Sequence, residues 1–284
     1  MTYRFVGERG EFNVVRKGIS RAFWNDIYHW LIKLSWRYFW LLLVAIYGGV
    51  NVLFAILFML GGDCIHGADP NSFSDHFFFS IQTIATIGYG ALYPKTLYAD
   101  LLVSIEAFLG VVITALSTGL VFAKFSRPTA RVLFSDRAVI TEFNDERTLM
   151  FRMANLRGNQ IVDATVDVSF VRFETTSEGE RFRRFYTLPL KRRRTSMFAL
   201  SWTVMHVIDE ESPLYGLSPE DWEEDQAEMI ISMNGVDGTF GQMIHARYSY
   251  TIDEVAIDAR FVDILTVRED NMLEVDFSHF HHVE

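Results

Sequence analysis

Cysteine is almost absent from this chain of 284 residues, in which Cys64 is the only one. A lone cysteine cannot form an intrachain disulfide, so a fold built on disulfides is excluded and Cys64 is interpreted as a structural thiol. The sequence also lacks internal repeats, a glycine-rich linker and a nucleotide-binding fingerprint. It contains no nucleophile–base set and no metal-ligand spacing. Nothing in it therefore favours an enzyme or a nucleic-acid partner.

Charge is missing from two long apolar stretches. Residues 40–60 carry no charged side chain over 21 positions, and at about 1.5 Å per residue such a helix is roughly 31 Å long, enough to cross a bilayer. Residues 101–123 form a second run with one charge, Glu106. These lengths favour two transmembrane helices over two buried helices of a soluble core. The first run starts well into the chain and has no small-residue cleavage site, so it is not interpreted as a signal peptide.

Charge also divides the chain. Residues 1–131 carry a net charge of +3 and residues 132–284 carry −13. The segment between the apolar runs is acidic, and the basic residues that flank the runs all lie outside it: Lys33, Arg37, Lys124, Arg127 and Arg131. By the positive-inside rule, both termini are predicted to be cytoplasmic and the segment between the runs to face outward. On physical grounds alone, these basic residues are orientation signals.

Residues 24–35 precede the first run and have an amphipathic helical pattern. Ile27, Trp30 and Leu31 share one face, while Lys33 lies largely on the other. The pattern fits a short helix in the cytoplasmic membrane interface, with an ordinary amphipathic surface helix as the alternative.

The segment between the runs contains a short apolar helix at 74–85. Ser74 is the expected N-cap, and Asp75 favours the first helical turn. The helix is too short to span a membrane, and at membrane depth it must be sheltered by protein because its ends expose backbone polar groups. One chain has only two spanning helices to shelter it, so the sequence predicts an oligomer.

Beyond the second run the pattern changes to short strands. Residues 164–170 and 246–252 alternate apolar and polar positions, with Val166, Val168 and Phe170 on one face of the first segment. Similar runs lie near 138–143, 148–154, 197–207 and 228–233. Turn clusters separate them, so the pattern predicts an antiparallel β-sandwich of roughly 120–150 residues.

The pentapeptide Thr86-Ile87-Gly88-Tyr89-Gly90 directly follows the short helix. A dehydrated potassium ion needs a ring of oxygens, and one chain offers a row of carbonyls only if its backbone handedness alternates, which Gly88 and Gly90 tolerate. The motif resembles the carbonyl-lined filter of potassium channels. The Thr86 hydroxyl and the carbonyls of Thr86, Ile87, Gly88 and Tyr89 would then supply stacked K⁺ sites in a fourfold assembly.

The chain resembles the inward-rectifier potassium channel family, specifically its bacterial branch, from about residue 20 to 270. Besides the filter, the matching segments are Ser35-Trp36-Arg37, Ala123-Lys124-Phe125-Ser126-Arg127-Pro128, Arg131-Val132-Leu133-Phe134-Ser135 and His245-Ala246-Arg247-Tyr248-Ser249-Tyr250. The resemblance implies a homotetramer whose immunoglobulin-like cytoplasmic domains form a second vestibule.

The resemblance also implies roles for single residues. Phe122 falls where the family places the bulky residue that closes the bundle crossing, Gly110 and Gly119 would let the second helix bend, and the loop Val236–Met243 would narrow the cytoplasmic pore. Thr114 stands where strong rectifiers carry Asp or Asn, so cytoplasmic Mg²⁺ or polyamines would be weak pore blockers. Anionic phospholipids would bind the basic residues Arg37, Lys124, Arg127 and Arg131.

Some positions depart from the family pattern. Many relatives pair an acid behind the filter with a base just after it, whereas this chain has Gln82 and either Ala91 or Leu92 there. Glu106 is the only ionisable group inside the second run; we interpret it as a brace for the filter, with direct ion binding as the alternative. Three histidines lie near the C-terminus: His279, His281 and His282. We interpret them as part of a solvated tail, with a metal site as the alternative.

These patterns together predict a two-span transmembrane pore domain with a re-entrant pore helix, an all-β cytoplasmic sandwich, and assembly as a homotetramer. The expected division is a cytoplasmic segment with the interfacial helix at 1–35, the pore domain at 36–127 and the cytoplasmic domain at 128–284. Within the pore domain we expect spans at 38–60 and 99–125, the pore helix at 74–85 and the filter at 86–90.

The predicted function is passive potassium transport across the bacterial inner membrane, gated at the bundle crossing and the cytoplasmic loop and regulated by anionic lipid. No cofactor is expected besides K⁺ ions in the filter. A membrane-anchored receptor that acts through its β-domain and a non-selective cation channel are the alternatives. Tyr89 argues against the second, because an acid there would loosen the filter.

Overall fold

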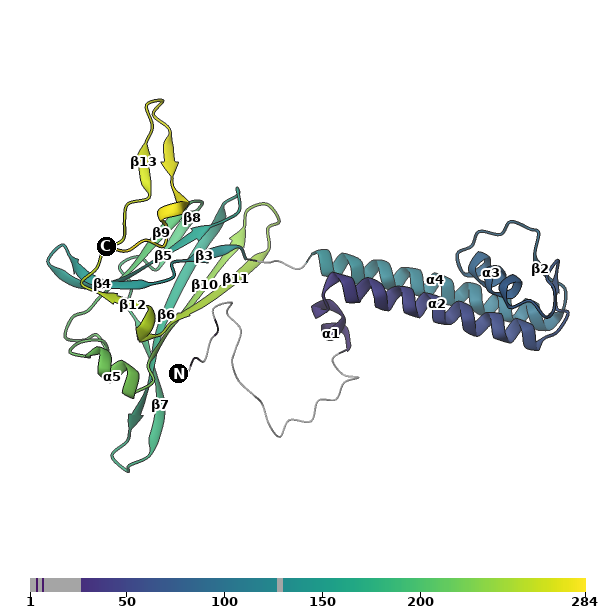
Figure 1. Cartoon of the computed structure of the whole chain (residues 1–284), viewed down its shortest axis with the longest axis horizontal. Helices are drawn as coiled ribbons and strands as arrows, with labels where there is room; N and C mark the ends of the chain where they lie inside the picture. The colour runs from purple at the N-terminus through teal and green to yellow at the C-terminus, as the bar shows by residue number, and fades with distance from the viewer. Residues whose placement is uncertain (1–3, 5–6, 8–26, 127–129) are drawn as a thin grey trace. The chain divides into compact units, whose positions relative to one another are not determined.

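The two apolar runs fold into long helices in the computed structural model, which describes residues 4, 7, 27–126 and 130–284 (Figure 1). The chain divides into two compact units. One is Ile19–Arg127, whose described part is mainly helical, and the other is Pro128–Glu284 together with Met1–Gly18, whose described part is mainly β. The filter motif lies in the first unit and the long antiparallel strands lie in the second.

The described part of the helical unit contains α1 (Ile27–Lys33), α2 (Trp36–Leu60), α3 (Phe73–Ile84) and α4 (Leu97–Phe125). Both α2 and α4 are long and apolar enough to cross a membrane, and only 22% and 11% of their most apolar windows are buried within the chain. Such exposure is not that of core helices in a soluble domain. Two short strands pair with each other: β1 (Ile65–His66), which precedes α3 in the sequence, and β2 (Tyr93–Pro94), which follows it.

The N-terminus of α3 differs from the sequence prediction. Ser72 has an extended backbone, and its hydroxyl accepts a hydrogen bond from the Asp75 N–H at 3.3 Å. Ser74, the predicted N-cap, lies inside the first turn, so that prediction is wrong. Two serines two residues apart offer the same capping chemistry, and only the backbone conformation selects between them.

α3 packs against α2 through aromatic side chains. The rings of Phe58 and Phe79 meet edge to face with their centroids 5.1 Å apart. Phe54 and Cys64 belong to the same buried cluster. The Cys64 thiol is fully buried, 3.3 Å from the carbonyl oxygen of Phe58, and burial raises its pKa. Cys64 therefore fills space in this cluster.

The two main sheets in the described part of the β unit have five strands each. One has the order β11-β10-β6-β7, with β8 also paired to β6; the other has the order β12-β4-β5-β3, with β9 also paired to β5. The first comprises β6 (Ile161–Thr175), β7 (Arg181–Leu188), β8 (Arg194–Phe198), β10 (Glu228–Asp237) and β11 (Met243–Tyr250). The second comprises β3 (Val132–Phe134), β4 (Ala138–Phe143), β5 (Glu146–Asn155), β9 (Ser201–Val207) and β12 (Val255–Ile257).

Among the described residues of this unit, the sheets are accompanied by three short helical elements, α5 (Pro219–Glu224), η2 (Ile252–Glu254) and η3 (Phe277–His279), and by a hairpin of β13 (Leu265–Val267) and β14 (Leu273–Val275). All strand pairs of the two main sheets are antiparallel except β12 with β4. The predicted fold class, two spanning helices and a largely antiparallel β unit, is confirmed.

Alternation along the strands places the core between the sheets. On β6, Val166, Val168 and Phe170 are buried, while the residues between them are partly exposed. The predicted strand at 246–252 ends earlier, because β11 stops at Tyr250 and Thr251 caps the turn η2. The predicted strand at 197–207 is two strands, β8 and β9, which pair with different sheets.

The C-terminal segment is anchored on the β unit through one residue, Phe280. Phe280 is fully buried in a cluster with Ala154 and Ile264. Nδ1 of His281 accepts a hydrogen bond from the Asp136 N–H at 3.1 Å. The segment is therefore anchored by an apolar residue to which the sequence pattern gave no weight, while His279 and His282 remain exposed to solvent.

Candidate ion-conduction site

The filter motif begins where α3 ends, and its backbone handedness alternates. Thr86, Gly88 and Gly90 have φ values of 53°, 60° and 82°, whereas Ile87 and Tyr89 are not among the described residues with positive φ. A glycine takes such a conformation freely, but for Thr86 it costs about 1–2 kcal/mol. Thr86 is thus the one strained residue among the three left-handed positions of the motif.

The loop is joined to α3 by backbone hydrogen bonds. The Thr86 N–H donates to the Thr83 carbonyl at 3.0 Å, and the Ile87 N–H donates to the Gln82 carbonyl at 2.8 Å. Gln82 thus contacts the motif through its backbone. Within one chain the side chains of the motif are uncovered: Ile87 is 45% exposed and Tyr89 is 76% exposed.

A buried polar cluster connects all three longer helices. Asn51 of α2, Ser80 of α3 and Glu106 of α4 are each at most 1% exposed. The Ser80 hydroxyl lies 3.0 Å from Oδ1 of Asn51 and also contacts Oε1 of Glu106. A hydroxyl has one proton to donate, so both contacts are hydrogen bonds only when Glu106 carries a proton of its own. Oε2 of Glu106 has no partner among the described residues.

Sequence reasoning singled out Glu106 but missed Asn51 and Ser80. Asn51 is an amide inside a run without charges, and it sits where an unpaired polar group would be costly. Its Nδ2 donates to the Tyr47 carbonyl at 2.7 Å, which leaves Oδ1 facing Ser80. A polar residue inside an apolar run was the signal that could have found it.

Gly110 lies against the end of α3. A Cβ atom at Gly110 would stand 2.5 Å from the carbonyl oxygen of Ile84, whereas one at Gly119 would meet nothing within 4 Å. α4 is an unbroken helix through both positions. The contact gives Gly110 a packing role that the sequence did not reveal.

Thr114 faces the same hollow as the start of the motif. A cavity of about 400 Å³ is lined by Thr86, Gly110, Val111 and Thr114 among others. Thr114 therefore presents a hydroxyl near the end of α3 and no charge. Further along α4, Phe122 is 73% exposed.

The predicted lipid-binding residues fall into different environments. Arg37 and Arg131 are exposed, and Arg127 lies outside the described residues. Nζ of Lys124 instead donates to the carbonyls of Ile32, at 3.0 Å, and Leu34. It also lies 5.1 Å from the ring centroid of Trp36. Lys124 thus joins the end of α1 to α4.

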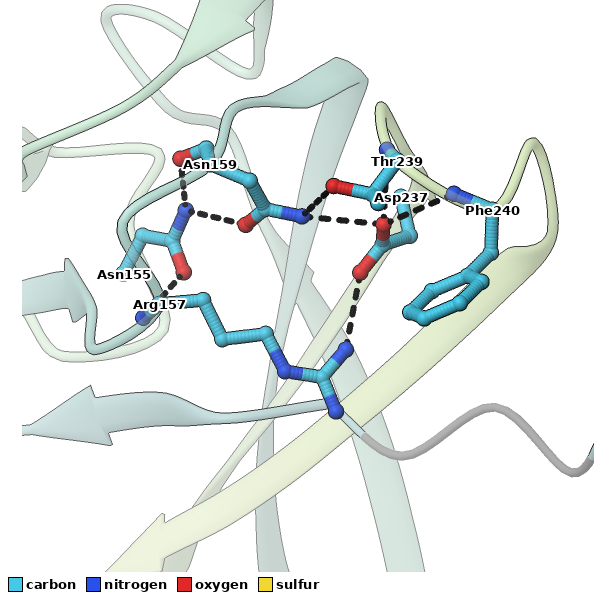
Figure 2. Close-up of polar contacts among 6 residues, drawn as sticks. All are labelled: Asn155, Arg157, Asn159, Asp237, Thr239 and Phe240. Atoms are coloured by element: carbon cyan, nitrogen blue, oxygen red, sulfur yellow. Dashed lines mark hydrogen bonds and ion pairs between the residues drawn. The ribbon is translucent and has the colours of Figure 1, made fainter. Parts of the chain in front are cut away.

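The loop Val236–Met243 comprises the turn at 238–242 and the adjoining ends of β10 and β11, and Figure 2 shows how it is held. The Asp237 side chain is 2% exposed and accepts hydrogen bonds from Nη1 of Arg157 at 2.8 Å and from Nδ2 of Asn159 at 2.9 Å. It also accepts from the N–H groups of Thr239 and Phe240 within the turn.

These contacts fix the charge of Asp237. Burial raises its pKa, but hydrogen bonds from Thr239, Asn159, Phe240 and Arg157 outweigh that effect and hold the pKa below its usual value. The loop at 155–160, which sequence reasoning did not single out, therefore determines where the turn lies. Phe240, at its tip, is 70% exposed.

The described residues contain no group of three or more His, Cys, Asp or Glu side chains placed to hold a metal ion. The metal alternative for His279, His281 and His282 accordingly gains no support.

Two spanning helices, a half-length helix that ends at a loop of alternating handedness, and an antiparallel β unit define a channel-type pore module joined to a β-domain. The family models agree: residues 39–127 match "Ion channel" and residues 132–284 match "Inward rectifier potassium channel C-terminal domain".

Known relatives match along almost the whole chain. The chain is 43% identical over 281 residues to the inward rectifier potassium channel Kirbac3.1 of Paramagnetospirillum magnetotacticum, covering 99% of this chain and 95% of that one. It is 30% identical to the mouse (Mus musculus) G protein-activated inward rectifier potassium channel 2, covering 98% and 71%. Among solved structures, Spo0M of Bacillus subtilis covers 46% of this chain and 50% of its own at 10% identity and a TM-score of 0.25, which carries no argument.

The chain therefore belongs to the inward-rectifier potassium channel family, and its nearly full-length similarity to a bacterial member confirms the predicted bacterial branch. The family consists of ion channels and not of enzymes.

The contact between α3 and α4 predicts different effects for two glycines. Gly110→Ala should lower the thermal unfolding midpoint of the detergent-solubilised protein, because its methyl group would collide with the Ile84 carbonyl and overpacking of this kind costs about 1–3 kcal/mol. Gly119→Ala, which adds the same methyl to an open position, is the matched control and should leave the midpoint unchanged. Equal losses in the two variants would show that helix bending, and not the Ile84 contact, requires glycine.

Proposed function

We propose that four copies of this chain form a potassium-selective channel whose ion filter is Thr86–Gly90. The observation that carries the proposal is the alternating handedness at Thr86, Gly88 and Gly90, directly after the end of α3. Alternation turns successive carbonyls toward one side, where those of four chains can replace the hydration shell of K⁺. The oxygens would be the carbonyls of Thr86, Ile87, Gly88 and Tyr89 and the hydroxyl of Thr86.

Exposure within one chain supports a fourfold assembly. The filter side chains Ile87 and Tyr89 and the α4 residue Phe122 are large, apolar or aromatic, and uncovered. A half-length helix at membrane depth needs protein around it, and two spanning helices do not surround it. In a homotetramer the C-terminal ends of four α3 helices would direct their partial negative charge at the cavity that Thr114 lines.

The buried cluster on α3 is proposed to brace the filter. Glu106 contacts Ser80 behind the motif and is fully buried, so direct contact with permeant ions is the weaker alternative. Gln82 supports the loop through its carbonyl. Together they would replace the acid–base pair that many relatives carry behind the filter.

Two constrictions are proposed to gate the pore. Four Phe122 rings at the cytoplasmic end of α4 would make an apolar gate that closes by dewetting. The Val236–Met243 turn would form a second constriction in the cytoplasmic domain. Bending at Gly119, and to a smaller extent at Gly110 because of its Ile84 contact, would move the first gate.

We propose residues 1–35 as a cytoplasmic segment with the interfacial helix, 36–127 as the pore domain in the bacterial inner membrane and 128–284 as the cytoplasmic domain. Both termini would then lie in the cytoplasm, as the positive-inside rule requires. Anionic phospholipids would bind the exposed Arg37 and Arg131, together with Arg127 and Lys124.

The filter assignment is tested by ion flux in liposomes that contain the purified full-length protein. K⁺ and Rb⁺ should permeate, Na⁺ should not, and Ba²⁺ should block, because it is close to K⁺ in size and doubly charged. Tyr89→Asp should raise Na⁺ permeability while the protein still elutes as a tetramer. Equal Na⁺ and K⁺ fluxes in the unmodified protein would refute the assignment.

Lipid binding is tested by comparing two basic residues. Arg37→Gln should shift the anionic-lipid concentration for the half-maximal effect on K⁺ flux by about fivefold, since each basic group near an anionic leaflet is worth about 1 kcal/mol. Lys124→Gln should also lower the thermal midpoint, because Lys124 contacts the end of α1. An unchanged lipid response in both variants would leave these residues as topology signals.

Weak rectification is predicted from Thr114. Its hydroxyl offers a dipole without net charge, whereas an acid about 4 Å from a cationic blocker would contribute about 4 kcal/mol at an effective dielectric constant near 20. Mild block by cytoplasmic spermine or Mg²⁺ is expected, and Thr114→Asp should make it tighter and more voltage-dependent. Two-sided bilayer recordings measure this block. Strong block of the unmodified channel would mean that the charge that binds the blocker lies at another residue.

A further inference from the structure

His206 occupies a core position of the β-sandwich. On β9, Trp202 and Val204 belong to the buried core, and strand alternation places His206 on the same face. The residue is 2% exposed. Among the described histidines of the β unit it is the only one that is buried. A titratable ring therefore stands where the strand pattern calls for an apolar side chain.

Both ring nitrogens have a hydrogen-bond partner in a connection between strands. Nδ1 lies 2.7 Å from the carbonyl oxygen of Pro189, in the segment between β7 and β8, and Nε2 lies 2.8 Å from Oγ of Ser212, in the turn after β9. A carbonyl oxygen only accepts, so Nδ1 carries the proton of the neutral ring and Nε2 accepts the Ser212 hydroxyl proton. His206 thus joins a connection of one sheet to the turn that leaves the other.

The same hydroxyl holds the backbone of the 209–217 turn. Oγ of Ser212 accepts a hydrogen bond from the Leu214 N–H at 3.2 Å, and the Ser212 carbonyl accepts one from the Tyr215 N–H at 3.0 Å. Ser212 is 6% exposed, and Leu214 is part of the sandwich core. The packing of this turn on the core therefore depends on a hydroxyl that His206 orients.

A proton on Nε2 would change this arrangement. A protonated imidazole has two donors and no acceptor, so Nε2 could no longer accept the Ser212 hydroxyl proton. That hydroxyl would lose its acceptor at a buried position, and a charge would stand in the core; both changes cost free energy. Burial lowers the pKa of His206, and the Pro189 carbonyl and the nearby Asp209 offset this effect only in part.

The surroundings offer a charged ring little compensation. Asp209 is the acid that acts on His206 electrostatically. Leu149, directly opposite on β5, carries no charge, and the buried Arg152 lies on the face of β5 turned away from Leu149. The other charged residues of β5, of the segment 189–193 and of the turn are exposed to solvent: Glu146, Arg147, Lys191, Arg192, Arg193, Glu210 and Glu211.

We propose that the contact between His206 and Ser212 is an acid-sensitive link, which releases the 209–217 turn from the core in mildly acidic solution while the two sheets stay folded. The released ring titrates near its ordinary pKa of about 6.5, whereas the packed ring resists protonation. The stability of the packed turn is therefore fully present above about pH 6.5 and falls as the pH drops below it. The link lies within the β unit and does not depend on ion conduction.

Hydrogen exchange followed by mass spectrometry on the detergent-solubilised full-length protein tests the link. Exchange times are scaled for the intrinsic pH dependence of the exchange reaction. Between about pH 7.5 and about pH 5.5, the protection of peptides that cover 209–217 should fall roughly three- to tenfold, because the open turn takes up a proton that the packed turn resists. Peptides from β6 should keep their protection.

Variants assign the effect to the ring. His206→Gln offers a donor and an acceptor but does not titrate, so protection of the turn should become independent of pH. His245→Gln removes an exposed histidine of the same unit and should leave the pH dependence unchanged. If His206→Gln does not fold, His206→Met fills the core position with an apolar side chain, and protection should again be independent of pH.

Four results would overturn the proposal. The first is unchanged protection of 209–217 in the unmodified protein at the lower pH. The second is a pH dependence that persists in His206→Gln or His206→Met, and the third is its loss in His245→Gln. The fourth is an equal fall in the β6 peptides, which would assign the effect to the whole β unit and not to this link.

Discussion

A helix of twelve residues is only about 18 Å long, and the pore unit depends on burying it at membrane depth. In lipid, every backbone and side-chain polar group needs a partner, so a short helix is stable there only where protein surrounds it. Phe79 packs on Phe58 along its length, and Gly110 lets α4 approach the carbonyl of Ile84 at its end. Ser80 supplies the polar contact to both spanning helices. The position of α3 determines where the filter loop begins, so the same contacts also position the loop.

In the β unit, the side chain of Asp237 holds an exposed turn in one position. A turn of five residues between two long strands has no intrinsic reason to hold one position, yet Asp237 binds both the turn and the loop at 155–160. Because Asp237 is the last residue of β10, its place is already determined by pairing with Ile161 on β6. The position of the exposed Phe240 is therefore determined, through the Asp237 carboxylate, by the strand register of the sheet. A pore constriction formed by this turn would therefore be held as rigidly as the sheet itself.

The sequence predicted the parts of the structure that depend on periodicity and on local backbone demands. Two charge-free runs predicted α2 and α4, strand alternation predicted β6, and glycine spacing predicted the alternating handedness of the filter motif. It did not predict contacts between distant segments, such as Asn51 with Ser80 or Arg157 with Asp237, because polar residues in a run or a loop carry no mark of their partner. The anchoring of the C-terminal segment was missed for the same reason: the pattern showed polar residues, but the burial of Phe280 depends on Ile264 and Ala154.

Two buried ionisable groups show how environment decides the chemistry of a site. Glu106 contacts the Ser80 hydroxyl in a medium where charge is costly, and a carboxyl group can lose its charge by taking up a proton. Arg152 has no such option, because a guanidinium does not lose its proton, and an aromatic ring covers one of its faces without neutralising it. A buried carboxyl group can thus adapt its charge to its surroundings, whereas a buried arginine keeps its charge and depends on neighbours such as the Phe261 ring and the Asp263 carboxylate.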